Sequence, residues 1–191
     1  YVTSSNSISG GSLTGLGIGA KEINKVLGVF KAFCTRVGEG PFPTEIFGDE
    51  AEKIREIAGE FGTTTGRPRR IGWFDAVAAK YSARINGLDS LVITKLDILD
   101  HFEKIKVCTS YEYRGEKIDF FPSDENILSE IKPIYEEFEG WDESTYNVDS
   151  IEKINSKAKK FIKNLEKIVG IPIDIISTGP SRKATIEVND L

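Results

Sequence analysis

Two short apolar runs in the chain are typical of strands that are buried on both faces. Ser90–Thr94 and Pro172–Ile176 are rich in β-branched residues, and polar residues or Gly bound each of them. A polar segment follows each run directly, Lys95–Asp97 in the first case and Ser177–Pro180 in the second. Because ligands bind at the carboxyl ends of strands in open α/β sheets, we expect both polar segments to border a binding site.

Three longer segments carry apolar residues at helical spacing, and we predict helices over residues 49–61, 74–85 and 149–169. Gly87 and Gly170 follow the second and third segments and are typical helix ends. The side chains expected to face the core are Ile54, Ile57, Ala58 and Phe61 in the first, Val77, Ala78, Tyr81 and Ile85 in the second, and Ile151, Ile154, Ala158, Phe161, Ile162, Leu165 and Ile168 in the third.

The remaining segments complete an α/β pattern. The shorter predicted elements are a helix at 21–27, a strand at 29–37, a hairpin formed by 105–111 and 117–120, and an edge strand at 184–188. Residues 122–149 are rich in Pro, Asp and Glu, and we predict loops and short surface elements there. The predicted fold is therefore α/β, part of a large mostly parallel sheet flanked by helices, with a β-hairpin and a surface subdomain.

Residues 1–19 are almost all Gly, Ser, Thr, Asn and small apolar residues, which predicts a loop with at most one short strand. Such a segment suits a backbone nest around a phosphate, and it suits a flexible linker equally well. The chain opens at Tyr1 and contains no Met. We therefore expect a processed chain or a fragment of a longer protein.

Composition argues against several classes of function. With a formal charge of −5 and 39% hydrophobic residues, the 191 residues suit a globular domain rather than a dedicated binder of nucleic acid or anionic membranes. No apolar run approaches the roughly 18 residues of a membrane span, and no signal peptide is recognisable. Cys34 and Cys108 lack metal-ligand spacing, and His101 has no cluster beside it, so we expect reduced thiols, a surface histidine and a cytoplasmic protein.

Residues 62–70, Gly-Thr-Thr-Thr-Gly-Arg-Pro-Arg-Arg, carry the strongest chemical signal, and we call them the Thr/Arg loop. Gly62 and Gly66 permit a tight turn, the hydroxyl and backbone N–H groups donate hydrogen bonds, and the three arginines offer planar forks that fit carboxylate or phosphate. The loop is therefore a candidate anion site. An ordinary solvated loop and an arm for the DNA minor groove are the alternatives, and the acidic chain argues against the second.

Thr94-Lys95-Leu96-Asp97 is a candidate reader of guanine. One carboxylate accepts hydrogen bonds from both N1–H and the 2-amino group of guanine, a pair of donors that adenine lacks, and the stem of Lys95 can cover the base plane. The alternative is a strand that runs into a helix with a solvated Lys and Asp.

Several short segments, taken together in their order and spacing along the chain, match the pattern of one known family. They are Tyr1–Asn6, Thr35–Gly38, Gly40–Glu45, Gly62–Arg70 with Gly72-Trp73, Thr94–Asp97 with Leu99-Asp100, and Ser177–Pro180. Together they resemble the carboxyl-terminal part of the adenylosuccinate synthetase family, although no single segment is specific. The resemblance implies that residues 1–191 are the carboxyl-terminal portion of one larger α/β domain.

The resemblance implies an activity. Enzymes of this family use GTP to phosphorylate the 6-oxygen of IMP, and the amino group of L-aspartate then displaces phosphate to give adenylosuccinate, with Mg²⁺ holding the phosphates. A chain similar to them is expected to belong to a purine-biosynthetic ligase that is a homodimer and binds IMP, GTP and L-aspartate.

The resemblance also implies roles for individual residues. The expected aspartate-binding residues are Thr63, Thr64, Thr65, Gly66, Arg67 and Arg69. The expected IMP-binding residues are Thr3, Val37, Gly38 and Arg67. The expected GTP-binding residues are Arg69, Lys95, Leu96, Asp97, Ser177, Thr178 and Gly179.

The chain also departs from the family pattern. The family's Gly-Asp-Glu-Gly-Lys phosphate loop, which supplies the catalytic Asp and a magnesium ligand, does not occur in it, and the neighbours of His101 do not match the family's catalytic His. We therefore expect the catalytic residues and magnesium ligands in a missing half, and no activity from these 191 residues alone. A non-catalytic guanine-nucleotide or anion-binding module of this length is the alternative.

Overall fold

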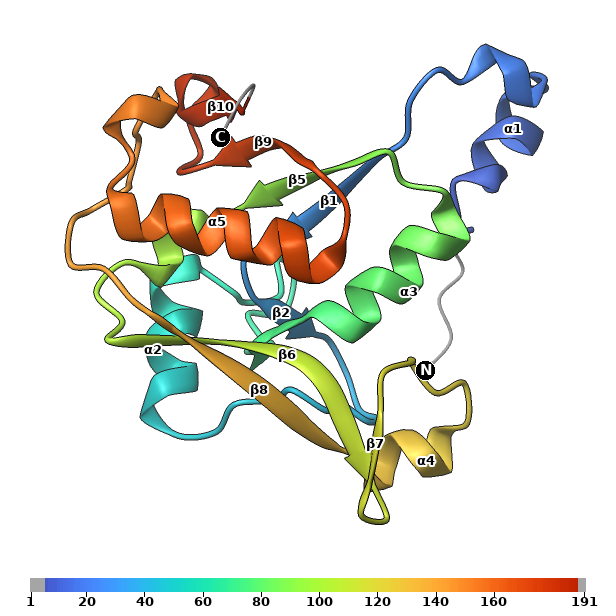
Figure 1. The fold of residues 1–191 in the computed structure, drawn as a ribbon, viewed down its shortest axis with the longest axis horizontal. Helices are drawn as coiled ribbons and strands as arrows, with labels where there is room; N and C mark the ends of the chain where they lie inside the picture. The colour runs from blue at the N-terminus through green and yellow to red at the C-terminus, as the bar shows by residue number, and fades with distance from the viewer. Residues whose placement is uncertain (1–5, 189–191) are drawn as a thin grey trace.

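The computed structural model describes residues 6–188. Its centre is a four-stranded sheet with the strand order β1-β5-β9-β10 (Figure 1). The strands are β1 (Leu27–Lys31), β5 (Ser90–Thr94), β9 (Ile173–Ser177) and β10 (Thr185–Glu187). The first three are parallel and β10 is antiparallel to β9, so the predicted buried strands and the edge strand are confirmed, as is the α/β class.

The two apolar runs form the neighbouring strands β5 and β9, and both lie inside the sheet. Leu91 and Ile93 of β5 and Ile173 and Ile176 of β9 are at most 2% exposed. Ile93 pairs with Ile176, which brings the carboxyl ends of β5 and β9 to the same edge of the sheet. The polar segments that follow the two strands therefore start side by side.

Helices α3 (Ala76–Asn86) and α5 (Ser156–Val169) lie across one face of this sheet (Figure 1). The buried side of α5 consists of Ala158, Phe161, Ile162, Leu165 and Val169, close to the predicted stripe. Its predicted start near residue 149 is wrong. The side chain of Asn155 caps the helix by accepting from the N–H of Ala158 at 2.8 Å, and residues Ile151–Lys153 form a separate 3₁₀ turn.

The predicted helix over residues 49–61 corresponds to α2 (Asp49–Ala58), which buries Ala51 and Ile54. Ile57 and Phe61 were predicted to face the core, and this is wrong, because they are 54% and 40% exposed. In α3 the buried side is built from alanines and Val77, and Ile85 is exposed. Alanine side chains let this helix pack closely against its neighbours, so the spacing of the larger apolar residues predicted the wrong inward side.

A second sheet contains the predicted hairpin. Its strands are β4 (Phe74–Asp75), β6 (Lys104–Tyr113), β7 (Glu116–Ile118) and β8 (Lys132–Glu139). Arg114 and Gly115 join β6 to β7 with φ of 51° and 84°, the left-handed pair of a tight hairpin turn. The prediction of loops and short elements over 122–149 is wrong at β8, an eight-residue strand that pairs along β6. The acidic residues of β8 face water, so the alternation of apolar and polar residues is hard to see in the sequence. The helix α4 (Glu125–Glu130) precedes this strand.

The first third of the chain differs most from expectation. The helix α1 (Gly10–Leu16) lies within the predicted loop, and the predicted helix at 21–27 is only the 3₁₀ turn Ala20–Glu22. The predicted strand at 29–37 is divided between β1 and β2 (Cys34–Arg36), because the buried pair Ala32-Phe33 turns into the core. Strand β2 pairs with β3 (Arg70–Gly72). Near the other end of the chain, residues Arg182–Ala184 form a further 3₁₀ turn.

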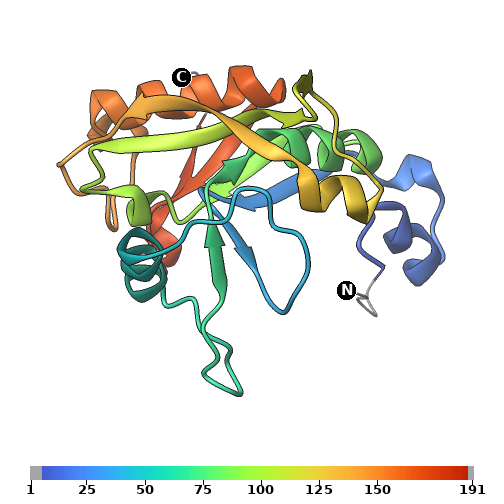
Figure 2. The same ribbon diagram turned by 90° about the horizontal axis from the view of Figure 1, so that it is seen from below.

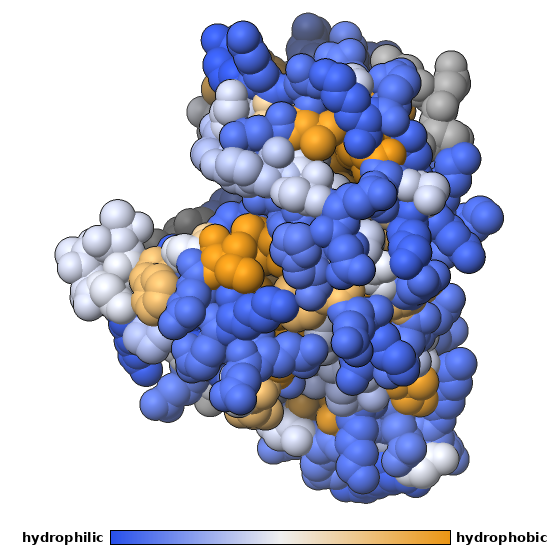
Figure 3. All heavy atoms as spheres, turned by 90° about the vertical axis from the view of Figure 1, so that its left-hand side faces the viewer, coloured by the Kyte–Doolittle hydropathy of each residue, from blue (hydrophilic) through white to orange (hydrophobic). Residues whose placement is uncertain are grey.

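No helix in residues 6–188 has both the length and the apolar character to cross a bilayer. On the face drawn in Figure 3, hydrophilic side chains predominate and apolar ones form small separate groups. His101 is exposed, as predicted for a surface histidine.

Candidate functional site

A cavity of about 540 Å³ opens where β5 and β9 end, and we call it the strand-end pocket. It is lined by Ile57, Ala58, Thr94, Lys95, Asp97, Ile98, Tyr146, Ser177, Gly179 and Pro180. The two polar segments predicted to border a site thus meet in one cavity. Ile57 and Tyr146 were missed as lining residues, because their position depends on elements distant in sequence.

Asp97 is held in this pocket by the short 3₁₀ helix Leu96–Leu99. Leu96 and Ile98 on either side of it are buried, and Lys95 before it has the left-handed φ of 59°. The Oδ1 atom of Asp97 is buried and has no hydrogen-bond partner among the described residues. Burial also raises the pKa of Asp97. An acceptor without a donor is costly in a protein interior, so this carboxyl group suits a ligand that donates hydrogen bonds.

Asp100, three residues further on, has the opposite surroundings. Its carboxylate accepts from Trp141 Nε1 at 2.6 Å, from the Thr145 N–H at 2.7 Å and Oγ1 at 2.8 Å, and from Ser144 Oγ at 3.2 Å. These bonds fix residues 141–145 and place Tyr146 in the pocket wall. Asp100 is therefore a structural support of the pocket rather than a ligand-facing group.

The segment after β9 is tightly packed around Thr178 and Gly179. Thr178 is fully buried, its Oγ1 donates to the carbonyl oxygen of Val148 at 2.7 Å, and its own carbonyl accepts from the Asn147 N–H at 2.9 Å. A Cβ on Gly179 would lie 2.6 Å from Asn147 Oδ1. Of the predicted GTP-binding residues, Lys95, Asp97, Ser177 and Gly179 line the pocket, whereas Arg69 and the buried residues Leu96 and Thr178 do not.

The Thr/Arg loop leaves the end of α2 as a narrow ribbon. The Arg69 N–H donates to the Glu60 carbonyl at 3.0 Å, and the Gly62 N–H donates to the Arg67 carbonyl at 2.8 Å. In Figure 2 its tip projects from the body of the molecule, beside the segment that follows β2. Residues 63–68 are exposed, and the Arg67 guanidinium has no hydrogen bond or ion pair within residues 6–188. The predicted aspartate-binding residues of the tip are thus accessible.

The other two arginines of the loop are engaged inside the protein. Arg70 forms a two-bond ion pair with Glu45 and donates to the carbonyl oxygens of Gly38 and Gly40 at 3.2 and 2.8 Å. The expectation that Arg70 offers its fork to a ligand is therefore wrong. Arg69 pairs with Glu60 at 2.7 Å, and its side chain remains 30% exposed.

The predicted IMP residues lie beside the foot of this loop. Arg36 of β2 pairs with Arg70 of β3, so the turn at Val37 and Gly38 starts where the loop returns to the body. Val37 is 72% exposed, and Gly38 has the positive φ of 79° that favours glycine. Thr3 lies outside the described residues.

Glu60 joins the two parts of the site. Its Oε1 accepts from Lys31 Nζ at 2.7 Å and from Lys95 Nζ at 2.6 Å, and its Oε2 accepts from Arg69 Nη1 at 2.7 Å. Burial alone would raise the pKa of Glu60, but hydrogen bonds from the three cations outweigh it and lower the pKa to about 2. Sequence reasoning missed Glu60 and Lys31. The sequence carried no signal for Lys31, because the strand predicted over residues 29–37 hid its position at the carboxyl end of β1, opposite Thr94 of β5.

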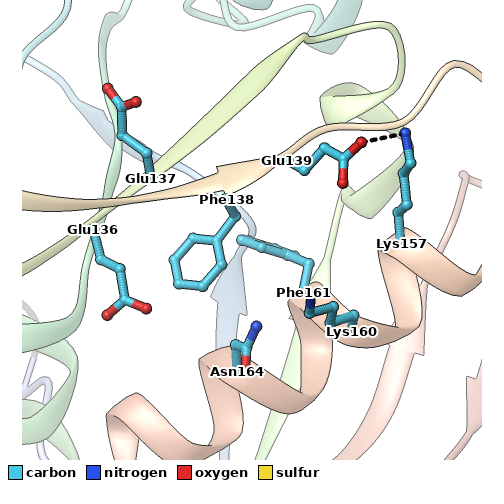
Figure 4. Close-up of a pocket in the computed structure, with 8 residues that line it drawn as sticks. All are labelled: Glu136, Glu137, Phe138, Glu139, Lys157, Lys160, Phe161 and Asn164. Carbon is cyan, nitrogen blue, oxygen red and sulfur yellow. Dashed lines mark ion pairs between the residues drawn. The ribbon is translucent and has the colours of Figure 1, made fainter.

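A separate hollow of about 250 Å³ lies between β8 and α5 (Figure 4). Its walls carry charges of both signs, and Glu139 and Lys157 pair there at 2.7 Å. It contains none of the residues predicted for ligand binding. Within residues 6–188 no three His, Cys, Asp or Glu side chains are grouped so as to hold a metal ion. The strand-end pocket and the Thr/Arg loop therefore form the candidate site.

Comparison with known sequences identifies relatives along the whole chain. The profile of the family described as adenylosuccinate synthetase matches residues 1–186. The adenylosuccinate synthetase of Brachyspira hyodysenteriae is 48% identical over 191 residues, which are 100% of this chain and 45% of that protein. The adenylosuccinate synthetase of Lactobacillus gasseri is 50% identical over 186 residues, which are 97% of this chain and 43% of that protein.

Solved structures agree with these sequence matches. A fully ligated adenylosuccinate synthetase from Plasmodium falciparum matches with a TM-score of 0.94 and 41% identity, over 99% of this chain and 46% of that one. A cyanophage S-2L succinoaminodeoxyadenylate synthetase, with a TM-score of 0.54 and 14% identity over 100% of this chain and 41% of that one, shares the fold alone. The chain spans less than half the length of these relatives. Because the family profile covers nearly every residue, this chain belongs to the adenylosuccinate synthetase family.

Proposed function

We propose that this chain supplies the guanine pocket, the aspartate loop and part of the IMP site of a ligase of purine biosynthesis. The ligase joins IMP and L-aspartate at the expense of GTP and yields adenylosuccinate, GDP and phosphate. In this proposal the chain is the carboxyl-terminal portion of one larger α/β domain, and the complete enzyme is a cytoplasmic homodimer. Family membership and the matching structure support the proposal.

Asp97 carries the proposal for the nucleotide. Its buried Oδ1 has no partner among the described residues, and it lines a cavity at the carboxyl ends of two parallel strands. In our proposal the carboxylate accepts from N1–H and the 2-amino group of guanine, while the stem of Lys95 covers the base. Ser177 and Gly179 close the opposite wall, and Leu96 and Thr178 support these walls from behind.

The Thr/Arg loop is proposed to bind L-aspartate. Thr63, Thr64, Thr65 and Gly66 offer hydroxyl and backbone donors at the exposed tip, and Arg67 offers a fork without an internal partner in residues 6–188. Arg69 is proposed to lie between the bound aspartate and the strand-end pocket that holds GTP. Its pairing with Glu60, which also holds Lys95 of the pocket, supports that position.

The IMP contacts proposed for this chain are Thr3, Val37, Gly38 and Arg67. Exposure of Val37 beside the foot of the loop supports a shared position for IMP and aspartate. The residues that take the proton from IMP, those that stabilise phosphoryl transfer and the ligands of Mg²⁺ are proposed to come from the part of the family that this chain does not span. When bound, Mg²⁺ neutralises charge on the transferred phosphoryl group. The chain's own residues bind and orient the three substrates.

The test is Asp97→Asn in an enzyme of the family's full length that contains this chain. An Asn side chain accepts from N1–H but presents an N–H₂ group to the 2-amino group of guanine, so one charge-assisted bond is lost. The KM for GTP should rise by about 10- to 100-fold, the equivalent of about 1.5–3 kcal/mol. Xanthine carries a carbonyl at position 2 and should become the preferred base, because the amide introduced by the substitution donates to that carbonyl.

Use of XTP by the variant also serves as the control for damage to the fold, since a disrupted pocket gains no new substrate. A variant that keeps the wild-type preference for GTP over both ATP and XTP would contradict the assignment of Asp97. Lack of adenylosuccinate formation by the wild-type enzyme from IMP, GTP and L-aspartate would contradict the proposed activity itself.

A further inference from the structure

One buried carboxylate contacts cations from three separate elements. Lys31 ends strand β1, Lys95 follows β5, and Arg69 lies at the foot of the Thr/Arg loop. All three place a nitrogen 2.6–2.7 Å from an oxygen of Glu60. The Glu60 side chain is fully buried, whereas those of its partners remain 28–35% exposed. Glu60 is therefore an internal anchor for side chains that reach the surface of the site.

Lys95 is fixed at both of its ends. Its backbone has the left-handed φ of 59°, and its Nζ donates to Glu60 Oε1 and to the carbonyl oxygen of Ala58 at 2.9 Å. A free lysine side chain loses about 2 kcal/mol of rotamer entropy when it is ordered. Because Glu60 and the Ala58 carbonyl hold the Nζ atom, groups of the chain itself fix the stem of Lys95 along the pocket wall.

Arg69 is fixed by the same carboxylate and by its backbone. Its N–H donates to the Glu60 carbonyl, and its own carbonyl accepts from Arg55 Nε at 2.8 Å. Its Nη1 is bound to Glu60, but its Nε is buried and has no partner among residues 6–188. Arg69 is thus immobilised while part of its hydrogen-bonding capacity remains unused.

The charges at this junction favour an anion. Three cations meet one carboxylate, and the pKa of Glu60, about 2, keeps that carboxylate ionised throughout the physiological range. Two positive charges therefore remain uncompensated within the cluster, at the point where the strand-end pocket meets the foot of the Thr/Arg loop.

We propose that Glu60 is a positioning residue that sets Lys95 in the nucleotide pocket and Arg69 at the foot of the aspartate loop. A single carboxylate then preorganises two substrate sites, so its loss weakens both together. This inference rests on the proposed function of the pocket and the loop. Glu60 itself contacts no substrate, because its side chain is fully buried behind its three partners.

The test is Glu60→Gln in a full-length enzyme that contains this chain, with Glu56→Gln as the matched control. Glu56 lies on the helix that precedes Glu60 and is exposed, so the control removes one nearby charge without touching the cluster. Glu60→Gln should raise the KM for GTP and the KM for L-aspartate by about tenfold each, whereas Glu56→Gln should leave both within about twofold. The preference for GTP over ATP should persist in Glu60→Gln, because Asp97 is unchanged.

Glu60→Asp provides a second variant that keeps the charge among the cations. Its shorter side chain cannot hold all three nitrogens at once, so both KM values should rise by a smaller factor. If a folded variant of either kind lowers only kcat and leaves both KM values within about twofold, Glu60 is merely structural and the inference is overturned. A wild-type enzyme that uses neither GTP nor aspartate would overturn the proposed function, and this inference with it.

Discussion

Replacing Asp100 with Asn tests whether one buried carboxylate supports the wall of the strand-end pocket. Asp100 is 6% exposed, and its side chain receives four hydrogen bonds from residues 141–145. Oδ1 accepts from Trp141 Nε1 and Thr145 Oγ1, and Oδ2 accepts from the Thr145 N–H and Ser144 Oγ. Asparagine has the same shape but replaces one of these oxygens with an N–H₂ group.

The expected loss follows from which donors can adapt. In either orientation of the amide, one hydroxyl can rotate and accept from the new N–H₂ group. The other donor is an indole or backbone N–H, which cannot accept, so it faces a second donor and remains unsatisfied. One orphaned buried donor plus weaker bonds to a neutral acceptor should lower the free energy of unfolding by about 2–4 kcal/mol.

Urea unfolding of a full-length enzyme that contains this chain, followed by far-UV circular dichroism, measures this difference. Asp142→Asn is the matched control, because Asp142 lies on the same segment and is exposed, and its change should stay within about 0.5 kcal/mol. Since Tyr146 follows the anchored residues, Asp100→Asn should also raise the KM for GTP in a full-length enzyme. A loss below about 1 kcal/mol would refute the argument that these bonds hold the segment.

Three further predictions concern the site. Arg67→Leu should weaken aspartate binding by about 2–4 kcal/mol through loss of a charge-assisted pair, and an unchanged aspartate KM would remove that role. Gly179→Ala should raise the KM for GTP by about two- to threefold, because the new Cβ lies 2.6 Å from Asn147 Oδ1 and that side chain has to turn aside, and Asn147→Gly in that background should restore it. Folding lowers the pKa of Glu60 from 4.5 to about 2, so its ionised form stabilises the protein above pH 4.5 and this contribution is lost as pH falls toward 2. The difference in unfolding free energy between wild type and Glu60→Gln should therefore shrink by about 2 kcal/mol between about pH 5 and pH 3, and a constant difference would contradict the cluster.

The sequence alone determined those helices and strands in which the pattern of apolar residues matches the pattern of buried residues. Strands β5 and β9 are mostly apolar because each has a neighbouring strand on both sides and buries isoleucine or leucine side chains, and α5 carries a regular stripe because one side faces the core. The polar segments after β5 and β9 could be assigned to one site because strand direction places carboxyl ends together. Strand β8 was missed because its charged residues face water, and α1 was missed because it buries no residue.

Only the tertiary structure decided which polar side chains remain available for a ligand. Asp97 and Asp100 are chemically identical and three residues apart, yet one has a buried oxygen without a partner in residues 6–188 and the other receives four hydrogen bonds. The Arg67 guanidinium has no such partner in the part of the chain that the structure describes, while Arg70 is bound to Glu45, 25 positions away. The physical reason is that hydrogen-bond partners of a side chain come from segments distant in sequence, and packing alone brings those segments together.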